Sequence, residues 1–565
     1  MNFERFQTLL EPAHERFQGE PGQVLLTFVE EGGLERPLTA GTLAADVQRL
    51  AGGFRASGIN RQDLVVLILP HSADVVSSFW GVLECGAIPA IFPQITSRLD
   101  PGYYRERVRK LVEHAAPRAI VTTPDQHAPL IDILEGLGCA VHTIDALRSI
   151  STAESPPPAV QSADAEIALI QYTSGTTGLQ KGIALSHRAI LNNLEAIRVA
   201  AAVVPSDTIV TWLPFHHDMG LLTGCLLPIV LGIPAVVISP LHWVRDPALL
   251  LRKVHEHRGT LTWMPNFAFN LSVRGIRGRD LEGIDLSCWR RLYNASEPVR
   301  LASLQGFQKR FGPFGLKPSA LGAGYGLAEI TGAVSLTPIG SPPRVEWIRV
   351  REFQEEGLAV PCQAGTPGSI PIVSSGALVP GAQVSIVDGE DRPVDDRKVG
   401  HILVCSNSML RGYYRRDDLT MEAMRLGSHR TGDLGFMSDG ELFVTGRVKD
   451  LIITGGKNIY PEDLESVADS IPGLRPGRSV AFGVPDPAMG TEAIIMVCEL
   501  AQPGAEAEEL RVAQELRRLI TRSLEVTLSD IRFVERGWVL KTAAGKMARA
   551  ANREKYRRLP GTIGE

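Results

Sequence analysis

The first two-thirds of the chain alternates short apolar runs with amphipathic segments. Residues 64–69 read LVVLIL, and a helical pattern follows over about 72–85. Further apolar runs of strand length occupy residues 119–122, 167–172, 209–213 and 235–239. Strands that alternate with helices are typical of parallel sheets covered by helices on both faces. We therefore predict an α/β fold with a large N-terminal domain over residues 1–445.

The pattern changes after about residue 340. Short apolar runs at 371–374, 383–387 and 401–404 are separated by Gly, Pro and Asp turns, which predicts a small β-rich subdomain over about 340–445. Residues 446–565 then show hairpin strands, a helix from Pro461 and an amphipathic helix across 506–523. We predict a smaller α+β C-terminal domain there. The run SPPP at 155–158 predicts a solvated linker.

One uncharged stretch, residues 220–241, is long enough to cross a bilayer. Pro228, Gly232 and Pro234 interrupt it, and the β-branched run 236–238 follows. Proline and glycine end or kink a helix, and β-branched residues favour a strand. We predict a buried helix, a turn and a buried strand here, and no transmembrane segment.

Composition narrows the class of protein. A chain of 565 residues is too long for one compact core, so two or more domains are expected. The 58 Lys+Arg against 63 Asp+Glu give a net charge of -5 without a basic stripe, which excludes nucleic acid as a partner. Seven cysteines are scattered without paired spacing, so neither a disulfide framework nor a zinc site is expected. Together with charges as early as Glu4 and Arg5, this predicts a cytoplasmic protein.

The sharpest chemical signal is the segment TSGTTGLQKG at 173–182, directly after the apolar run 167–172. Its glycines leave backbone amides free to approach an anion, while four hydroxyls and Lys181 can hydrogen-bond phosphate oxygens. The glycine-to-lysine spacing differs from the nucleotide-binding P-loop, and no Ser or Thr follows Lys181. Composition alone leaves open a surface turn rich in Gly and Thr.

Further segments with polar chemistry follow. They are WLPFHHDMGL at 212–221, YNASEPVR at 293–300, AGYGLAEIT at 323–331, RTGDLG at 430–435, GRVKDL at 446–451 and LKTAAGKMAR at 540–549. Within them, Tyr325 offers an aromatic face for adenine, and Glu329 offers the hard oxygen ligand that Mg²⁺ prefers. An isolated histidine pair or Gly-x-Gly would carry little information, whereas the order of these segments is specific.

Taken together, these segments resemble the motifs of the adenylate-forming superfamily, which includes acyl-CoA synthetases, fatty acyl-AMP ligases, luciferases and peptide-synthetase adenylation domains. The resemblance runs from about residue 35 to 558, and the HDMG form at 217–220 is most like the fatty acyl-AMP ligases. It implies ATP-dependent activation of a fatty acid as acyl-AMP with release of pyrophosphate. It also implies that the C-terminal domain is mobile and rotates about a hinge near Lys449.

The resemblance assigns roles to individual residues. The implied ATP-binding set is Thr173, Ser174, Gly175, Thr176, Thr177, Gly178, Lys181, Ala295, Ser296, Glu297, Gly324, Tyr325, Gly326, Asp433, Arg447 and Lys546. The implied catalytic set is Thr176, His217, Glu329, Lys449 and Lys546. Within these sets, His217 stands between the acyl pocket and the nucleotide, Glu329 binds Mg²⁺, and Lys546 bridges the carboxylate and the α-phosphate.

The acceptor of the acyl group has two candidates. An extra segment between about 341 and 377 resembles an insertion of fatty acyl-AMP ligases, which deliver to the phosphopantetheine of an acyl carrier protein. The segment GGKNIYPEDLE at 455–465 resembles acyl-CoA synthetases equally, so free CoA is the alternative. The basic stretch 541–558 predicts either a contact for an acidic carrier or a solvated tail, the latter chiefly at 553–558.

A protein of another class, a non-catalytic scaffold that binds acyl chains or nucleotide, would be expected to lack a catalytic residue. Thr176, Glu329, Asp433, Arg447 and Lys546 are all present, so the sequence favours an active enzyme.

Overall fold

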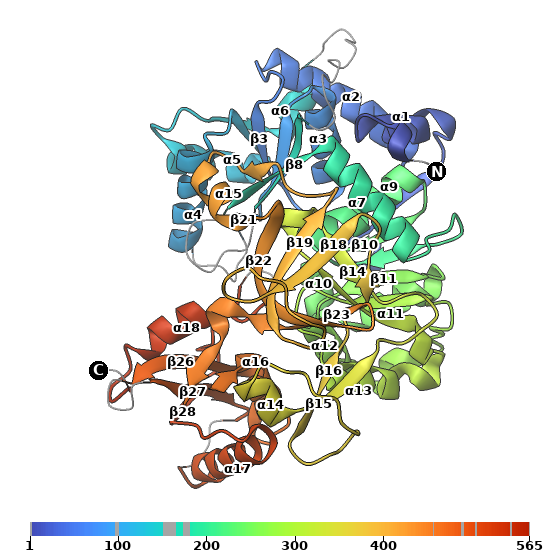
Figure 1. Ribbon diagram of the computed structural model, residues 1–565. Helices are drawn as coiled ribbons and strands as arrows, with labels where there is room; N and C mark the ends of the chain where they lie inside the picture. Colours follow the sequence, from blue (N-terminus) through green and yellow to red (C-terminus); the bar gives the residue numbers. More distant parts are fainter. Residues whose placement is uncertain are drawn as a thin grey trace.

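Figure 1 shows a computed structural model of the chain, with a large N-terminal part and a smaller C-terminal lobe. The structure describes residues 3–95, 101–150, 165–172, 181–455, 457–486, 491–502, 506–542 and 545–563. The expected linker at 155–158 and residues 173–180 of the Gly/Thr-rich segment lie outside these ranges. Within them, all seven cysteines are free thiols, and no helix is long and apolar enough to cross a bilayer.

The first sheet is parallel and follows the predicted alternation. Its strand order is β4 (Ile88–Ile91), β3 (Leu64–Ile68), β5 (Ala119–Thr122) and β6 (Ala140–Thr143). In β3, Val65 and Leu67 join one core cluster, whereas Val66 and Ile68 join another on the opposite face. Side chains alternate between the faces of a strand, so a strand buried on both faces reads as a continuous apolar run.

Helices cover both faces of this sheet. They are α2 (Ala40–Ala56) and α3 (Ala73–Glu84) on one face, and α4 (Pro101–Ala115) and α5 (Pro124–Leu134) on the other. Ser72 begins α3 as its N-cap, because its hydroxyl accepts a hydrogen bond from the amide of Asp74. The helix predicted over 72–85 is confirmed.

A second, larger sheet carries the remaining parallel strands. Its parallel part has the order β1 (Val24–Val29), β10 (Ala235–Ile238), β9 (Ile209–Thr211), β11 (Leu261–Met264), β12 (Arg291–Asn294) and β13 (Leu321–Gly326), with β2 (Glu35–Thr39) antiparallel at the edge. Associated helices are α1 (Leu10–Gly19), α7 (His187–Ala200), α11 (Ala248–Glu256), α12 (Asn266–Gly275) and α13 (Leu301–Phe311).

The β-rich region continues this sheet in antiparallel fashion. From β13 the order is β14 (Ala333–Leu336), β17 (Ala377–Leu378), β23 (Glu441–Arg447), β22 (Ser428–Ser438), β19 (Gly400–Ser406) and β18 (Ala382–Val387). The strands predicted at 383–387 and 401–404 are confirmed as β18 and β19. The extra segment contributes a separate hairpin of β15 (Val345–Arg349) and β16 (Ser369–Val373), with α14 (Val350–Glu355) between them.

One strand differs from its predicted environment. β7 (Ile167–Tyr172) does not belong to a parallel sheet; it pairs antiparallel with β8 (Gly182–Ser186), next to β20 (Gly412–Tyr413). The nine residues 173–181 join the two strands. A parallel connection requires a crossover of roughly a dozen residues or more, so this short segment forces an antiparallel return.

The uncharged stretch 220–241 is buried inside the N-terminal part. It contains the end of α8 (Asp218–Leu221), a π-helical turn (Leu222–Leu226), α9 (Leu227–Leu231) and then β10. Gly232 ends α9 with a φ of 69°, a conformation that favours glycine. The predicted helix, turn and buried strand are confirmed.

The C-terminal lobe is α+β, as predicted. It contains the hairpin β24 (Ile452–Thr454) and β25 (Lys457–Ile459), α16 (Pro461–Asp469), and the sheet β26 (Leu474–Asp486), β27 (Thr491–Leu500) and β28 (Asp530–Val534) with α17 (Glu506–Leu524). The expected solvated tail at 553–558 is wrong at Tyr556, which α18 (Arg549–Tyr556) buries together with Asn552, whereas Glu554 is exposed and Arg553 and Lys555 are half-buried. The Tyr556 hydroxyl donates a hydrogen bond of 2.7 Å to Asp530, while Arg557 and Arg558 are exposed.

Candidate active site

Five neighbouring parallel strands of the large sheet end at one edge. The residues that follow them are Trp243 after β10, Trp212 after β9, Phe267 after β11, 295–297 after β12 and Tyr325 near the end of β13. Trp243 lies on the short helix α10 (Pro240–Arg245). Ligands of open α/β sheets bind outside the carboxyl ends of the strands. This edge therefore defines the candidate site.

Asp433 organises one end of the site. Its Oδ2 accepts a hydrogen bond of 2.6 Å from the Tyr325 hydroxyl, and its Oδ1 lies 3.0 Å from Nε of Arg447. Asp433 and Arg447 face each other across β22 and β23. Burial and the Asp433 carboxylate raise the pKa of Tyr325 well above its ordinary value, so the phenol remains a donor. Three residues predicted to bind ATP are thus brought together.

Glu329 lies next to the end of the Gly/Thr-rich segment. Its Oε1 accepts a hydrogen bond of 2.9 Å from the Tyr413 hydroxyl, and Nζ of Lys181 lies 4.8 Å from the centroid of the same tyrosine ring. Tyr413 was not predicted from the sequence: it lies 84 residues from Glu329 and belongs to none of the motifs. The other predicted residues of this segment, 173–178, lie outside the described residues.

Lys546 reaches the same edge from the C-terminal lobe. Burial lowers its pKa and Arg447 adds to that effect, whereas Asp218, Glu297 and Asp433 act in the opposite direction. The amide of Lys546 donates to the Thr542 hydroxyl at 3.2 Å, and the amide of Thr542 donates to the Lys546 carbonyl at 2.8 Å. Lys546 is half-buried, and its side chain is near enough to Asp218, Glu297 and Asp433 of the N-terminal part for their charges to act on its pKa.

The two adjacent histidines occupy different environments. Nδ1 of His217 lies 2.6 Å from Oδ1 of Asp218, beside the lysine. Although burial opposes it, the proximity of His217 and Lys546 lowers the pKa of Asp218. His216 is half-buried, and desolvation together with its neighbour His217 lowers its pKa to about 3, so it stays neutral. The contact with Asp218 brings His217 to the lysine side of the site, and its catalytic role stays a prediction.

The predicted adenine segment 295–297 is held in an unusual backbone conformation. Ser296 has a φ of 69°, which non-glycine residues rarely adopt and which is concentrated at functional sites. The Glu297 carboxylate accepts a hydrogen bond of 2.9 Å from the amide of Phe267 at the start of α12, and burial raises its pKa. Glu297 thus lies on the lysine side of the site, and its contact with adenine stays a prediction.

The glycines of 324–326 are required by the chain itself. A Cβ on Gly326 would lie 2.3 Å from the carbonyl oxygen of Gly332, and one on Gly324 would lie 2.7 Å from the Leu336 side chain. Lys449, the predicted hinge residue, lies in the short turn Val448–Asp450 between the large sheet and the C-terminal lobe. Burial and Arg447 lower its pKa.

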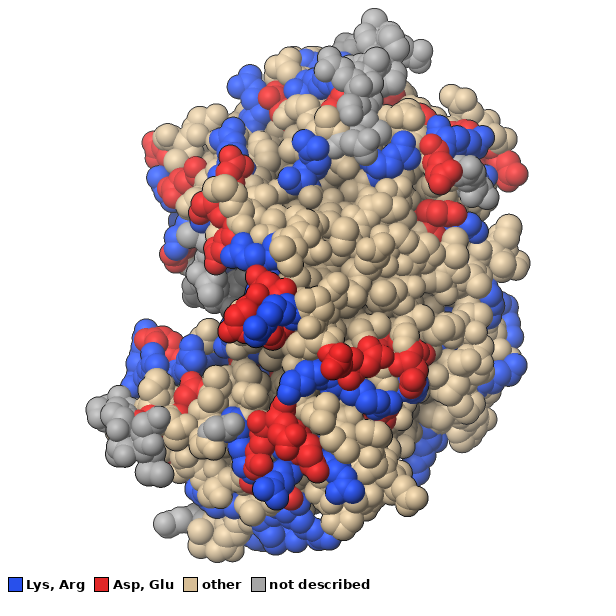
Figure 2. All heavy atoms as spheres, viewed as in Figure 1, with Lys and Arg blue, Asp and Glu red and all other residues tan. Residues whose placement is uncertain are grey.

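Direct contacts join the C-terminal lobe to this site. Nη1 of Arg300 lies 2.7 Å from Oδ1 of Asp463 on α16. An ideal Cβ on Gly545 would lie 3.0 Å from the Phe267 ring. Figure 2 shows a hollow on the left of the molecule where the lobe meets the remainder. In the described conformation the C-terminal lobe brings Lys546 to the carboxyl edge of the sheet, and we call this the lysine-inserted arrangement.

Substitution of Gly545 by alanine tests whether this contact supports acyl-AMP formation. Gly545 has a φ of 82°, so alanine strains the backbone and also crowds Phe267. We expect acyl-AMP formation to fall about tenfold in G545A, because displacement of this turn withdraws Lys546. The measurement is the rate of pyrophosphate release.

Gly537 provides the matched control. Its φ of 91° imposes the same backbone strain on alanine, but no atom lies within 4 Å of the added Cβ. G537A should lower thermal stability without the loss of rate. Equal rates for G545A and G537A would contradict a role for the Phe267 contact.

The sequence profile of the family described as AMP-binding enzyme matches residues 14–414, which is more than half of the chain. The chain belongs to the AMP-binding enzyme family. The match ends at the strand that carries Tyr413, and the C-terminal lobe with Lys546 lies beyond it.

Relatives of this AMP-binding enzyme include a 4-hydroxyphenylalkanoate adenylyltransferase of Mycobacterium marinum, 35% identical over 89% of the chain and 83% of the relative. The long-chain-fatty-acid–AMP ligase FadD26 of the same organism is 32% identical over 96% of both chains. A solved structure from work on fatty acyl-adenylate ligases of E. coli and L. pneumophila aligns with a TM-score of 0.90 at 28% identity, over 99% of this chain and 98% of the other. The α/β fold is that of adenylate-forming enzymes.

Proposed function

We propose that this protein uses Mg-ATP to activate a fatty acid as acyl-AMP and then transfers the acyl group to the phosphopantetheine thiol of a carrier protein. The observation that carries the proposal is the cluster of Tyr325, Asp433 and Arg447 at the carboxyl edge of the sheet, which the C-terminal lobe approaches with Lys546. The similarity to FadD26 and to fatty acyl-adenylate ligases supports the fatty-acid class.

The first half-reaction requires a carboxylate oxygen to attack the α-phosphorus of ATP while pyrophosphate leaves. A cation held beside the reacting atoms stabilises the negative charge that builds on the pentacoordinate phosphorus, and we assign this role to Lys546. Asp433 is positioned to accept hydrogen bonds from the ribose hydroxyls, with Tyr325 and Arg447 fixing its orientation.

The residues around Glu329 fit a magnesium ion. Tyr413 orients Oε1 of Glu329, and among the described residues no hydrogen bond reaches Oε2. Mg²⁺ is usually held by one or two carboxylates together with substrate phosphates. Glu329 would hold the ion, which would supply charge neutralisation at the phosphates.

The second half-reaction requires Lys546 to leave, so that a thiol can reach the acyl-AMP. We infer a rotation of the C-terminal lobe about the turn that contains Lys449, because this turn joins the lobe to the large sheet. Such hinge closure alternates one domain between two arrangements.

The extra hairpin bears on the choice of acceptor, because it packs against the C-terminal lobe. On α14, the Phe353 ring stacks on Tyr460 with centroids 5.2 Å apart, and Nε2 of Gln354 donates to the Leu524 carbonyl at 3.1 Å. Lys457 lies 3.4 Å from Glu355. These contacts stabilise the arrangement in which Lys546 is inserted.

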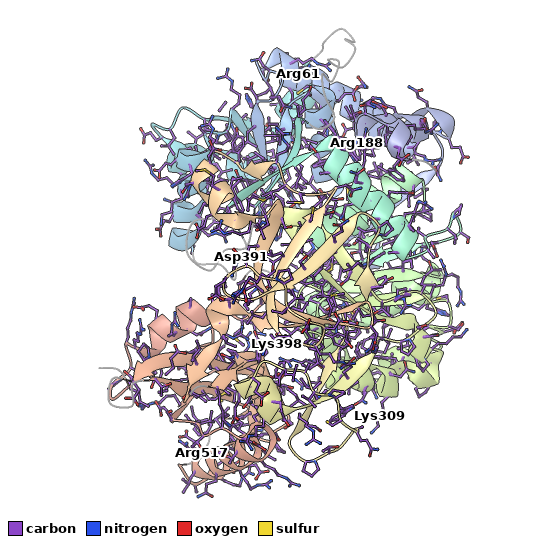
Figure 3. The ribbon with its side chains drawn as sticks, viewed as in Figure 1. Arg61, Arg188, Lys309, Asp391, Lys398 and Arg517 are labelled. Carbon is purple, nitrogen blue, oxygen red and sulfur yellow. The ribbon has the colours of Figure 1, made fainter. Side chains whose placement is uncertain are left out.

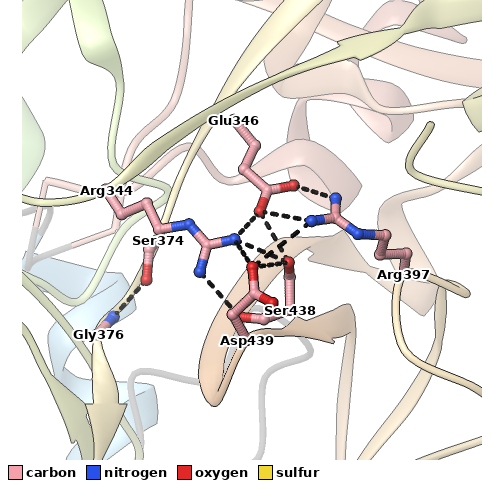
Figure 4. Close-up of polar contacts among 7 residues, drawn as sticks. All are labelled: Arg344, Glu346, Ser374, Gly376, Arg397, Ser438 and Asp439. Carbon is pink, nitrogen blue, oxygen red and sulfur yellow. Dashed lines mark hydrogen bonds and ion pairs between the residues drawn. The ribbon is translucent and has the colours of Figure 1, made fainter. Parts of the chain in front are cut away.

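A buried carboxylate anchors the hairpin on its other side (Figure 4). Glu346 on β15, 8% exposed, pairs with Arg344 and Arg397 and accepts a hydrogen bond of 2.7 Å from the Ser438 hydroxyl. Arg344 also lies 2.6 Å from Asp439. A buried carboxylate is stable only when it is paired in this way, so the hairpin has a fixed position from which α14 meets the lobe.

The fixed hairpin favours a carrier protein over free CoA. A ligand shifts a two-state domain equilibrium only by its differential affinity for the two states. The lobe must break its contacts with α14 to reach the thiol-accepting arrangement, so these contacts raise the free energy of that arrangement relative to the lysine-inserted one. A carrier protein can offset this difference in free energy through additional surface contacts, whereas the small CoA molecule makes few such contacts.

The Phe353→Ala variant tests this role of α14. We expect transfer to free CoA to rise several-fold in F353A, because loss of the ring stack with Tyr460 destabilises the lysine-inserted arrangement. The measurement is the initial rate of acyl-CoA formation from supplied acyl-AMP. Arg349→Ala, an exposed position on β15, is the matched control and should leave this rate unchanged.

The overall proposal is tested by product analysis. Purified protein is incubated with Mg-ATP and a fatty acid, with either CoA or a phosphopantetheinylated carrier protein. We expect acyl-AMP and pyrophosphate, followed by efficient acylation of the carrier. Products ADP and phosphate would contradict adenylate formation, and efficient acyl-CoA production by the intact protein without a carrier would favour the acyl-CoA synthetase.

A further inference from the structure

Two tryptophans stack at the edge of the sheet that forms the candidate site. The indole rings of Trp212, directly after β9, and Trp243, on α10, are parallel to within 7° with centroids 3.7 Å apart. Phe267 meets both rings edge-on, with centroid distances of 6.0 and 6.3 Å. Trp212 is 4% exposed and Trp243 is fully buried. The three rings form a rigid aromatic wall.

Both indole N–H groups of this wall lack an acceptor. Nε1 of Trp212 and Nε1 of Trp243 are buried and have no hydrogen-bond partner among the residues that the structure describes. Elsewhere in the same sheet region the indole of Trp289 is satisfied, since its Nε1 donates to the Thr262 hydroxyl at 3.0 Å. Buried donors are usually paired, so two unpaired donors in one stack require an explanation.

The order of the strands places the two tryptophans on the side of Lys546 that faces away from the nucleotide half of the site, where an acyl chain is expected. Along the sheet the strands run β13, β12, β11, β9 and β10. Tyr325, in the nucleotide half, belongs to β13, and Glu297, beside Lys546, follows β12. Phe267 follows β11 and lies under the Gly545 turn, and the two tryptophans follow β9 and β10. An acyl chain that starts at Lys546 and points away from the nucleotide therefore runs toward the stack.

We propose that the acid carries an oxygen substituent, a hydroxyl or a keto group near its carboxyl end, which accepts hydrogen bonds from Trp212 and Trp243. This inference rests on the proposed acyl-AMP chemistry and names the substrate class of the same site. A saturated chain leaves both donors unpaired, whereas an oxygen at that depth satisfies them. A site built to hydrogen-bond a substrate group discriminates strongly against the analogue that lacks it.

The first test compares three acids of equal chain length on the unmodified protein: the saturated acid, its 3-hydroxy derivative and its 4-oxo derivative. The readout is kcat/KM from acid-dependent ATP–pyrophosphate exchange. We expect at least one oxygenated acid to exceed the saturated acid about tenfold or more. A saturated acid that equals or exceeds both derivatives would overturn this inference alone, and an absence of exchange with every acid would overturn the proposed function itself.

The second test removes the donors and keeps the aromatic rings. In Trp212→Phe and Trp243→Phe, the ratio of kcat/KM for the oxygenated acid to that for the saturated acid should fall toward one. Trp80→Phe is the matched control, because Trp80 on α3 is also fully buried with an unpaired Nε1 but packs against Phe17 and Phe79. An unchanged ratio in both stack variants, or an equal fall in W80F, would overturn the assignment.

Discussion

Replacement of Lys546 by alanine is expected to lower acyl-AMP formation by about 10²-fold or more, as for loss of a preorganised donor to a transition state. In the described arrangement the charges of Asp218, Glu297 and Asp433 act on Lys546, and alanine removes the positive charge that the lysine brings to this edge of the sheet. Thioester formation from supplied acyl-AMP should be nearly unaffected, because the proposed rotation removes Lys546 before that step. The measurements are pyrophosphate release for the first half-reaction and acyl transfer to a carrier for the second.

Lys309→Ala provides the control for loss of a positive charge. Lys309 is exposed on α13, and Figure 3 shows it at the periphery of the molecule. Both half-reactions should be normal in K309A. Equal loss of both half-reactions in K546A would show that Lys546 supports the fold or the binding of acyl-AMP, and would remove its assignment to the first step.

Replacement of Glu329 by glutamine is expected to reduce turnover about 10- to 100-fold and to raise the magnesium concentration required for half-maximal rate. The substitution keeps the size of the side chain and the acceptor for Tyr413, but a neutral amide is a poorer ligand for a hard cation. Fatty-acid binding in the absence of ATP should barely change. The measurement is a magnesium titration of pyrophosphate release.

Glu422→Gln is the matched control for loss of a carboxylate, because Glu422 is exposed on α15 (Asp417–Ala423). Its magnesium dependence should equal that of the unmodified protein. Collapse of fatty-acid binding in E329Q with normal magnesium dependence would instead place Glu329 in the acyl pocket.

The α/β architecture could be predicted because it rests on local patterns. A continuous apolar run such as 64–69 predicts a strand buried on both faces. The structure confirms this prediction, because alternate residues of β3 belong to the core clusters on opposite faces of the sheet. The direction of β7 could have been predicted from the nine-residue connection to β8, which is too short for a crossover. The hydrophobic pattern alone does not report strand direction.

The site was predictable as a set of segments but not as a geometry. Motif order indicated Tyr325, Asp433 and Arg447 separately, and the antiparallel pairing of β22 with β23 brings two of them together. Tyr413 and the ion pair of Arg300 with Asp463 had no local signal, because each joins residues more than 80 positions apart. Such contacts depend on how whole elements pack.

The tryptophan stack shows the same limit. Trp212 and Trp243 are 31 positions apart, and each reads as an ordinary core residue after a strand. Only the parallel order of β9 and β10 places them face to face, and only the side-chain contacts show that their N–H groups are unpaired. The hypothesis about the substrate class therefore required the structure.

The most direct test of acyl-AMP formation is the fate of the carboxylate oxygen. Fatty acid labelled with ¹⁸O in both carboxyl oxygens is supplied with Mg-ATP and a carrier protein, and the nucleotide product is analysed by mass spectrometry. Attack of the carboxylate on the α-phosphorus predicts that AMP gains one ¹⁸O when the thiol displaces it. Unlabelled AMP, or label in inorganic phosphate together with ADP, would contradict the account.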